Sequence, residues 1–122
     1  MTLATAKRCL GLILAVSSFS LLLAGAGEKV KQVDSKYVCM YTNKHFTTEQ
    51  TPVSVEGRTY YACCEMCRNQ LRDDASTRTA VDPVSGNKVD KATAIVGVDK
   101  AGNVYFFESV ESLNQFRVPA KK

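Results

Sequence analysis

Hydrophobic residues are unevenly distributed along this chain. An apolar run from Cys9 to Ala26 follows the basic pair Lys7-Arg8 and ends in the small-x-small sequence Ala24-Gly25-Ala26. A basic start, an apolar segment and a small-residue site together predict a secretory signal peptide over residues 1–26, cleaved after Ala26. The protein is therefore expected in the periplasm or outside the cell. An uncleaved signal anchor is its only expected route to a membrane.

Beyond this segment, the pattern predicts a tether, a hairpin and a helix. Residues 27–36 are polar and charged, so we expect a short tether. Two β-prone stretches, residues 52–55 and 59–62, flank a turn in which Gly57 can adopt a positive φ, and they predict a β-hairpin. Residues 63–74 then follow with helical character.

The same pattern returns in the second half of the chain. Residues 102–116 line up with residues 57–71 without a gap, with glycine, tyrosine and Asn-Gln in register. A match of this length at one offset indicates an internal repeat. The sequence therefore predicts an α+β fold with two hairpin-plus-helix units in tandem, at residues 37–76 and 77–117, and a tail at 118–122.

Four cysteines remain after the signal peptide, and they carry the strongest chemical signal. Three follow the spacing Cys39-x23-Cys63-x3-Cys67. Thiolates select soft ions, and a turn plus a helix start can bring distant cysteines to one ion. Cys63, Cys67 and Leu71 share one face of the expected helix. The fourth thiol, Cys64, lies about 100° around the helix from Cys63. We expect one soft metal ion, Cu(I) or Zn²⁺, bound by Cys39, Cys63 and Cys67.

Four further side chains are candidate ligands of the same ion. Cys64 and the sole histidine, His45, carry soft-metal donors, and the thioethers of Met40 and Met66 suit Cu(I). A thiol in the first turn of a helix lies near the positive end of the helix dipole. We therefore expect the pKa of the helix-start thiols to be lowered, which favours the thiolate that a metal requires.

An even number of cysteines in an exported protein leaves two alternatives open. The thiols could staple an interaction domain through disulfides, although adjacent cysteines and those four apart on a helix fit disulfide geometry poorly. Alternatively, Cys64 and Cys67 could form the Cys-x-x-Cys dithiol of an exported thiol-disulfide redox protein. No nucleophile-histidine-acid set and no glycine-rich phosphate loop is found, so we do not expect an enzyme.

Charge bears on the choice of partner. The full chain has a net charge of +4 at pH 7, and its basic residues are scattered rather than clustered. Nucleic-acid-binding proteins concentrate such residues on one face, so no nucleic-acid partner is expected. The expected partner is the metal ion and, where the metal is passed on, a metal transporter or chaperone.

The cysteine spacing, with Tyr60-Tyr61 before the second cysteine, resembles the YHS and TRASH-like heavy-metal-binding domains. The segment Asp82-Pro83-Val84-Ser85-Gly86 is similar to the Asp-Pro-Val-Cys-Gly opening of a YHS domain, with Ser85 in place of the cysteine. The resemblance implies small treble-clef-like units, two in tandem, of which the second is degenerate. In that second unit Ser85, Glu108 and Ser112 would occupy the cysteine positions. It also implies a role in heavy-metal trafficking, sequestration or resistance, with Cys39, Cys63 and Cys67 as ligands.

Overall fold

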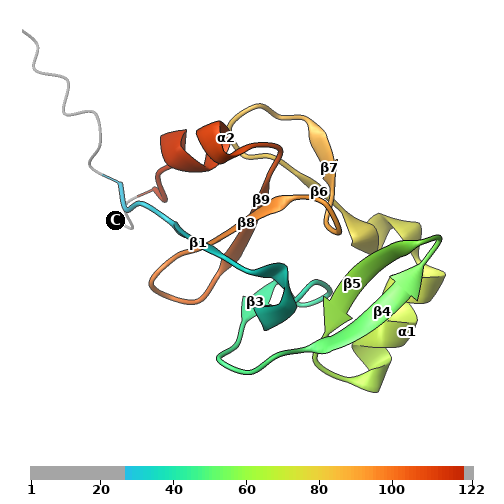
Figure 1. The fold of residues 1–122 in the computed structure, drawn as a ribbon. Helices are drawn as coiled ribbons and strands as arrows, with labels where there is room; N and C mark the ends of the chain where they lie inside the picture. The colour runs from blue at the N-terminus through green and yellow to red at the C-terminus, as the bar shows by residue number, and fades with distance from the viewer. Residues whose placement is uncertain (1–26, 120–122) are drawn as a thin grey trace, which may run out of the picture.

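A computed structural model describes residues 27–119 and shows a mixed α+β chain of short antiparallel sheets and two helices in that range (Figure 1). A three-stranded sheet has the order β1-β8-β9, and three two-stranded ribbons pair β2 with β3, β4 with β5, and β6 with β7. The elements are β1 (Lys31–Val33), η1 (Ser35–Tyr37), β2 (Val38–Cys39), β3 (Lys44–His45), β4 (Thr51–Val55), β5 (Arg58–Ala62), α1 (Glu65–Asp73), η2 (Ala75–Arg78), β6 (Thr79–Val81), β7 (Lys88–Asp90), β8 (Ile95–Val98), β9 (Val104–Phe107) and α2 (Val110–Gln115).

The expected hairpin and helix of the first half are confirmed. Strands β4 and β5 pair in antiparallel register from Thr51↔Ala62 to Val55↔Arg58, and the turn between them places Gly57 at φ 80°. The helix α1 begins at Glu65, two residues later than the sequence predicts, because Cys64 is extended (φ −149°, ψ 170°) and forms the N-cap. Cys63 and Cys64 therefore precede the helix, and Cys67 lies in its first turn.

The second half repeats this order of elements. The hairpin β8–β9 is followed by α2. Gly102 in the turn of this hairpin has a positive φ of 88°, comparable to the 80° of Gly57 in the first hairpin. The N-cap of α2 is Ser109, whose hydroxyl accepts a hydrogen bond from the backbone N–H of Ser112. Strand β9 and helix α2 thus stand where the gap-free match of residues 102–116 to 57–71 places them.

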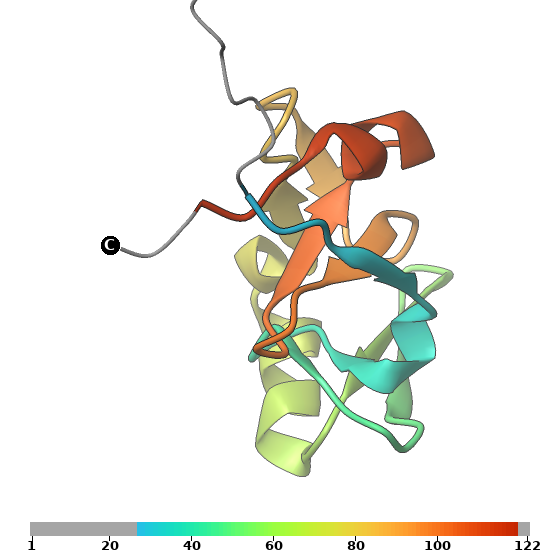
Figure 2. The same ribbon diagram turned by 90° about the vertical axis from the view of Figure 1, so that its left-hand side faces the viewer.

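The two halves are packed around one core. Figures 1 and 2 both show β4, β5 and α1 grouped at one end, with β8, β9 and α2 at the other. The main core cluster draws on both groups, and its buried members are Val38, Cys39, Met40, Val53, Tyr60, Ala62, Cys67, Leu71, Val96, Val104 and Phe106. A smaller cluster of Val30, Phe107 and Leu113 lies under α2. Burial of apolar surface between the halves therefore stabilises both of them together.

Polar contacts also connect each half to the other. Asp90 of β7 forms an ion pair with Arg58, and the hydroxyl of Tyr60 donates to the same carboxylate at 2.8 Å. In the opposite direction, the β8–β9 turn reaches β3, where the N–H of His45 donates to the carbonyl of Gly102 at 3.3 Å. Each hairpin thus contacts a short ribbon of the other half.

Residues 27–36, expected to be a tether, are part of the fold instead. Strand β1 pairs with β8 along Lys31↔Val98 to Val33↔Val96, and Val30 is buried against the second core cluster. Glu28 pairs with Val118, so the start and the end of the described chain lie side by side. A strand of three residues can form here because β9 covers only one edge of β8 and leaves the other edge free to pair with β1.

The expected signal peptide, residues 1–26, and the last three residues of the expected tail lie outside the described part of the chain. Within residues 27–119 there is no helix of the length and apolar character that crossing a membrane requires.

Candidate metal centre

Three cysteines come together at the junction between the β2–β3 ribbon and the start of α1. The Sγ atoms of Cys39, Cys63 and Cys67 all lie within 4.8 Å of one another. The sulfurs of Cys63 and Cys67 are 3.7 Å apart, close to the roughly 3.8 Å that tetrahedral zinc with bonds of about 2.3 Å requires between two ligands. Cys39 and Cys67 are buried, whereas Cys63 is exposed. This cysteine cluster could hold one metal ion with an opening towards solvent.

The thiol of Cys39 is held by backbone donors. Burial alone would raise its pKa, but hydrogen bonds from the side chain and N–H of Thr42, and from the N–H groups of Cys63 and Tyr41, outweigh burial and lower the pKa to about 7. Hydrogen bonds to the charged form stabilise it. The β2–β3 turn is thus arranged to support a thiolate at Cys39.

The other two thiols of the cluster behave differently from the expectation based on the helix dipole. Burial raises the pKa of Cys67, and the neighbouring thiols and the charge of Cys39 raise it further. The pKa of Cys63 is also raised, by burial and by its hydrogen bond with Cys39. The expected lowering was wrong for these two residues, because desolvation and a nearby negative charge exceed the effect of a short helix. A positive ion is what the cluster needs before all three can be thiolates.

Cys64 lies beside the cluster rather than in it. Its Sγ is 3.2 Å from that of Cys67, but it is not among the three ligand atoms that lie within 4.8 Å of one another. The side chain is exposed. Its pKa is lowered, first by the backbone N–H of Cys67 and then by the Cys67 thiol.

The remaining candidate ligands are spread over different environments. His45 pairs with Val38 across the β2–β3 ribbon and does not join the cysteine group. Met40 is completely buried in the main core, and Met66 is 58% exposed on α1. Within the described chain, only the three cysteines of the spacing motif form a preorganised donor set among histidine, cysteine and carboxylate side chains.

A buried lysine behind the cluster was missed by sequence reasoning. Lys91 is 5% exposed, and its ammonium donates to the carbonyl of Met40 at 2.6 Å and to the side-chain oxygen of Asn43 at 3.1 Å. Burial lowers its pKa to about 8, and the charge of Cys39 opposes that shift. Lys91 comes from the second half of the chain. That half therefore supplies both hydrogen bonds and a positive charge to the turn that carries Cys39. No local sequence signal marks such a residue, because its partners are 48 or more positions away.

The second half has a junction of the same construction with a carboxylate at its centre. Asp82 is completely buried, and one of its oxygens accepts from the N–H groups of Val84 and Ser85 at 2.7 and 3.2 Å. The other accepts from the N–H of Glu108 at 2.8 Å. The hydroxyl of Ser112 hydrogen-bonds to the same carboxylate. We call this arrangement the carboxylate junction.

The hydrogen bonds of the two junctions correspond position by position. Cys39 and Asp82 each accept from the N–H groups two and three residues later, and from the residue just after the following hairpin, Cys63 or Glu108. In each turn the fifth residue donates its N–H to the carbonyl of the first, which is Cys39 or Asp82, and that fifth residue, Asn43 or Gly86, has a positive φ.

This correspondence corrects part of the alignment made from the sequence. The structure places Asp82, not Ser85, in the position equivalent to Cys39, since the pair Val38↔His45 of the first ribbon matches Val81↔Lys88 of the second. Glu108 and Ser112 keep their assignment to the positions of Cys63 and Cys67. The segment from Asp82 to Glu108 is two residues longer than that from Cys39 to Cys63, so a gap-free alignment cannot show the relation.

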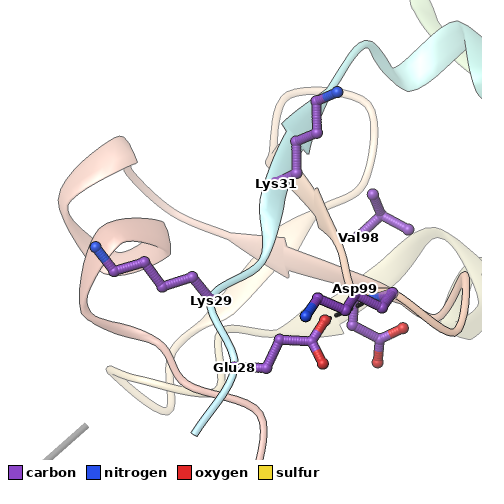
Figure 3. Close-up of a pocket in the computed structure, with 6 residues that line it drawn as sticks. Glu28, Lys29, Lys31, Val98 and Asp99 are labelled. Carbon is purple, nitrogen blue, oxygen red and sulfur yellow. Dashed lines mark hydrogen bonds between the residues drawn. The ribbon is translucent and has the colours of Figure 1, made fainter.

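A shallow hollow lies near β1 (Figure 3). Its volume is about 260 Å³, and its lining includes Lys29, Lys31 and Lys100 together with Glu28 and Asp99. The carboxylates are already engaged: Glu28 accepts from the N–H of Lys100 at 2.7 Å, and Asp99 accepts from Ala101, Asn103 and Tyr105. In Figure 3 the side chains of Lys29 and Lys31 extend in different directions, so the lysines do not converge on a ligand.

The comparisons with known proteins do not add a name to this site. No protein-family model, curated protein or solved structure matches the chain.

Proposed function

We propose that this chain is an exported soft-metal-binding protein that acts in metal trafficking, sequestration or resistance. The observation that carries the proposal is the convergence of Cys39, Cys63 and Cys67, from two separated segments, to within 4.8 Å. Thiolates favour Zn²⁺, Cu(I) and similar ions over hard cations. The predicted signal peptide, residues 1–26, would deliver the protein to the periplasm or outside the cell.

The arrangement of donors favours a site that exchanges its metal. Three protein thiolates leave at least one coordination position for an external ligand, whereas structural zinc sites are closed by four protein ligands. Cys63 is exposed, and it opens the cluster towards solvent. A metal transporter or chaperone with its own thiols would therefore be able to take the ion by ligand exchange, and Cu(I) or Zn²⁺ would suit the three sulfurs.

The resemblance to YHS and TRASH-like domains agrees with this proposal. It would make residues 37–76 and 77–117 two treble-clef-like units in tandem, of which only the first holds metal. The carboxylate junction supports the second part of that interpretation, because Asp82 stands where Cys39 stands in the first unit. In the second unit a side chain, rather than an ion, connects the turn to the helix.

Metal analysis of the purified, reduced protein tests the proposal. We expect about one equivalent of Zn²⁺ or Cu(I) to be retained, and Cys39→Ser, Cys63→Ser and Cys67→Ser each to lower the affinity at least tenfold. Cys64→Ser is the matched control, since that thiol lies outside the cluster, and it should retain wild-type affinity. The assignment is wrong if the three single variants hold as much metal as the wild type.

A free-thiol count on the protein from its export compartment tests the disulfide-stapled alternative. The cysteine cluster requires Cys39, Cys63 and Cys67 to be reduced when metal is bound. Two disulfides and no bound metal would favour the interaction domain instead.

A further inference from the structure

The fourth thiol has a position that the proposed metal site does not use. Cys64 is the extended N-cap of α1, exposed to solvent, and its Sγ lies 3.2 Å from that of Cys67. Cys67 is 1% exposed and belongs to the cysteine cluster. One buried ligand of the proposed ion therefore has a free, accessible thiol beside it, at a shorter distance than the Cys63 thiol.

The separation of the two sulfurs is close to that of a disulfide. A disulfide bond is about 2.05 Å long, so the two atoms need to approach by roughly 1 Å from their present 3.2 Å. Cys64 is the N-cap, with extended backbone angles and a carbonyl that accepts the first helical hydrogen bond from Arg68, so its exposed side chain can move without loss of a bond inside the helix. Cys63 is farther from Cys67, at 3.7 Å, and metal coordination would occupy its sulfur. Cys64 is therefore the thiol that can react while the metal is bound.

Pairing of these two thiols would dismantle the metal site. A disulfide sulfur is no longer a thiolate, so the bond would remove Cys67 from the ligand set and leave Cys39 and Cys63. Two thiolates at a partly exposed site hold a soft ion much less tightly than three, because the lost charge and donor atom are not replaced. Re-reduction would restore the third ligand.

On the basis of the proposed metal site, we propose that Cys64 and Cys67 form a redox switch that releases the metal when a disulfide-bearing oxidant, such as oxidised glutathione, reacts with the protein. The Cys64 thiolate attacks one sulfur of the oxidant, and one glutathione thiolate leaves. The Cys67 thiolate then attacks the Cys64 sulfur of the mixed disulfide, and the second glutathione thiolate leaves. Two electrons pass to the oxidant, and the ion loses one ligand.

The test uses Zn²⁺, which has no redox chemistry of its own. Zinc-loaded wild type and Cys64→Ser are treated with oxidised glutathione under anaerobic conditions, release is followed with a chromogenic zinc chelator, and disulfides are located by peptide mapping. We expect the wild type to release about one Zn²⁺ per Cys64–Cys67 disulfide and to rebind it after reduction. Cys64→Ser should bind zinc normally and release it at least tenfold more slowly.

Three results would overturn the switch: release from Cys64→Ser at the wild-type rate, a disulfide mapped to another pair of cysteines, or a Cys64–Cys67 disulfide in a protein that retains its zinc. Zinc binding before oxidant is added tests the proposed function separately. A reduced wild type that takes up no soft metal would overturn the metal site itself, whereas normal uptake followed by Cys64-independent release would overturn the switch alone.

Discussion

Two junctions in this molecule solve the same structural problem with different chemistry. Each connects a tight turn on a short ribbon to the start of the helix that follows a hairpin. In the first half the connecting group is the cysteine cluster, with Cys39 in the turn. In the second half it is the carboxylate junction, in which Asp82 makes the connection alone.

The two junctions differ in whether the charge and the hydrogen bonds that each one needs are supplied by the protein alone. Asp82 brings two oxygens and its own charge, and it accepts hydrogen bonds from both segments that it joins. Burial alone would raise its pKa, but those hydrogen bonds and that of Ser112 outweigh burial and lower it. The cysteine cluster instead leaves Cys63 and Cys67 as thiols of raised pKa beside Cys39. The carboxylate junction is therefore complete without a ligand, whereas the cysteine cluster would be completed by the proposed cation.

Exchanging the chemistry of the two junctions gives the largest expected effect. The triple variant Asp82→Cys, Glu108→Cys and Ser112→Cys should bind a second soft metal ion, because those positions correspond to Cys39, Cys63 and Cys67. Metal analysis should show the stoichiometry rising from about one to about two. The control replaces Ser85 instead of Asp82 in the same triple variant, as the gap-free alignment suggests. A second ion in that control, and not in the first variant, would refute the structural correspondence.

Removal of metal should affect the two halves unequally. An ion bound only by the folded state contributes about 4 kcal/mol to the free energy of unfolding when its free concentration is about 1,000 times the Kd. Chelation should lower the melting temperature accordingly. Hydrogen exchange measured by mass spectrometry should show faster exchange in α1 than in α2 after chelation. Equal loss of protection in both helices would mean that the shared core couples the halves too tightly for the junctions to act separately.

The structure also shows which features a single sequence reveals. Hairpins and helices were predictable because a turn glycine such as Gly57, β-prone flanks and helical spacing are local signals. The cysteine cluster was predictable because Cys63 and Cys67 lie four positions apart around the start of a helix, although Cys63 itself precedes that helix. Strand β1 was missed because a three-residue strand pairs by its backbone and leaves little side-chain pattern.

The carboxylate junction could not be found in this way. Asp82 in an Asp-Pro sequence has the appearance of a turn residue, and its contact with the N–H of Glu108 spans 26 positions. A backbone N–H is present at every residue except proline, so the sequence does not mark which one will be used. The same applies to Lys91, whose main partner is a backbone carbonyl.

Loss of the Asp82 carboxylate should destabilise the protein without changing its metal binding. Asp82→Asn places an amide among backbone N–H donors, and we expect a cost of about 3 kcal/mol in the free energy of unfolding, since hydrogen bonds to a charged group are lost. Urea denaturation measures this cost, and metal content should be unchanged. Glu108→Gln is the control, because the junction uses the backbone N–H of Glu108, while its exposed side chain accepts a hydrogen bond from Asn87 away from the junction. A neutral Asp82→Asn would contradict the role given to the carboxylate.

The same variant predicts a dependence on pH. The folded-state pKa of Asp82 is lowered, so its contribution to stability is present above the unfolded value of about 3.9 and is lost as the pH falls through the folded value. Wild type should therefore exceed Asp82→Asn in stability by the full amount at pH 6 to 7. The gap should close as the pH falls below about 4. A gap that stays constant down to pH 2 would mean that shape, and not charge, accounts for the effect.

The smallest expected effect concerns the serine that stands in the position of Cys67. Ser112 is 7% exposed and its hydroxyl is one of several groups around Asp82, whose other partners are backbone N–H groups that Ser112→Ala leaves in place. Ser112→Ala should therefore cost about 1 kcal/mol, the usual net value of one hydrogen bond, with metal affinity unchanged. Cys67→Ala, the equivalent change in the first half, should abolish tight metal binding and so lose the whole contribution of the ion. Comparison of the two variants by urea denaturation, with and without chelator, measures how far each junction depends on its helix residue. If Ser112→Ala lost as much stability as Cys67→Ala in the presence of metal, the carboxylate junction would need its third partner as strictly as the metal needs its third thiolate.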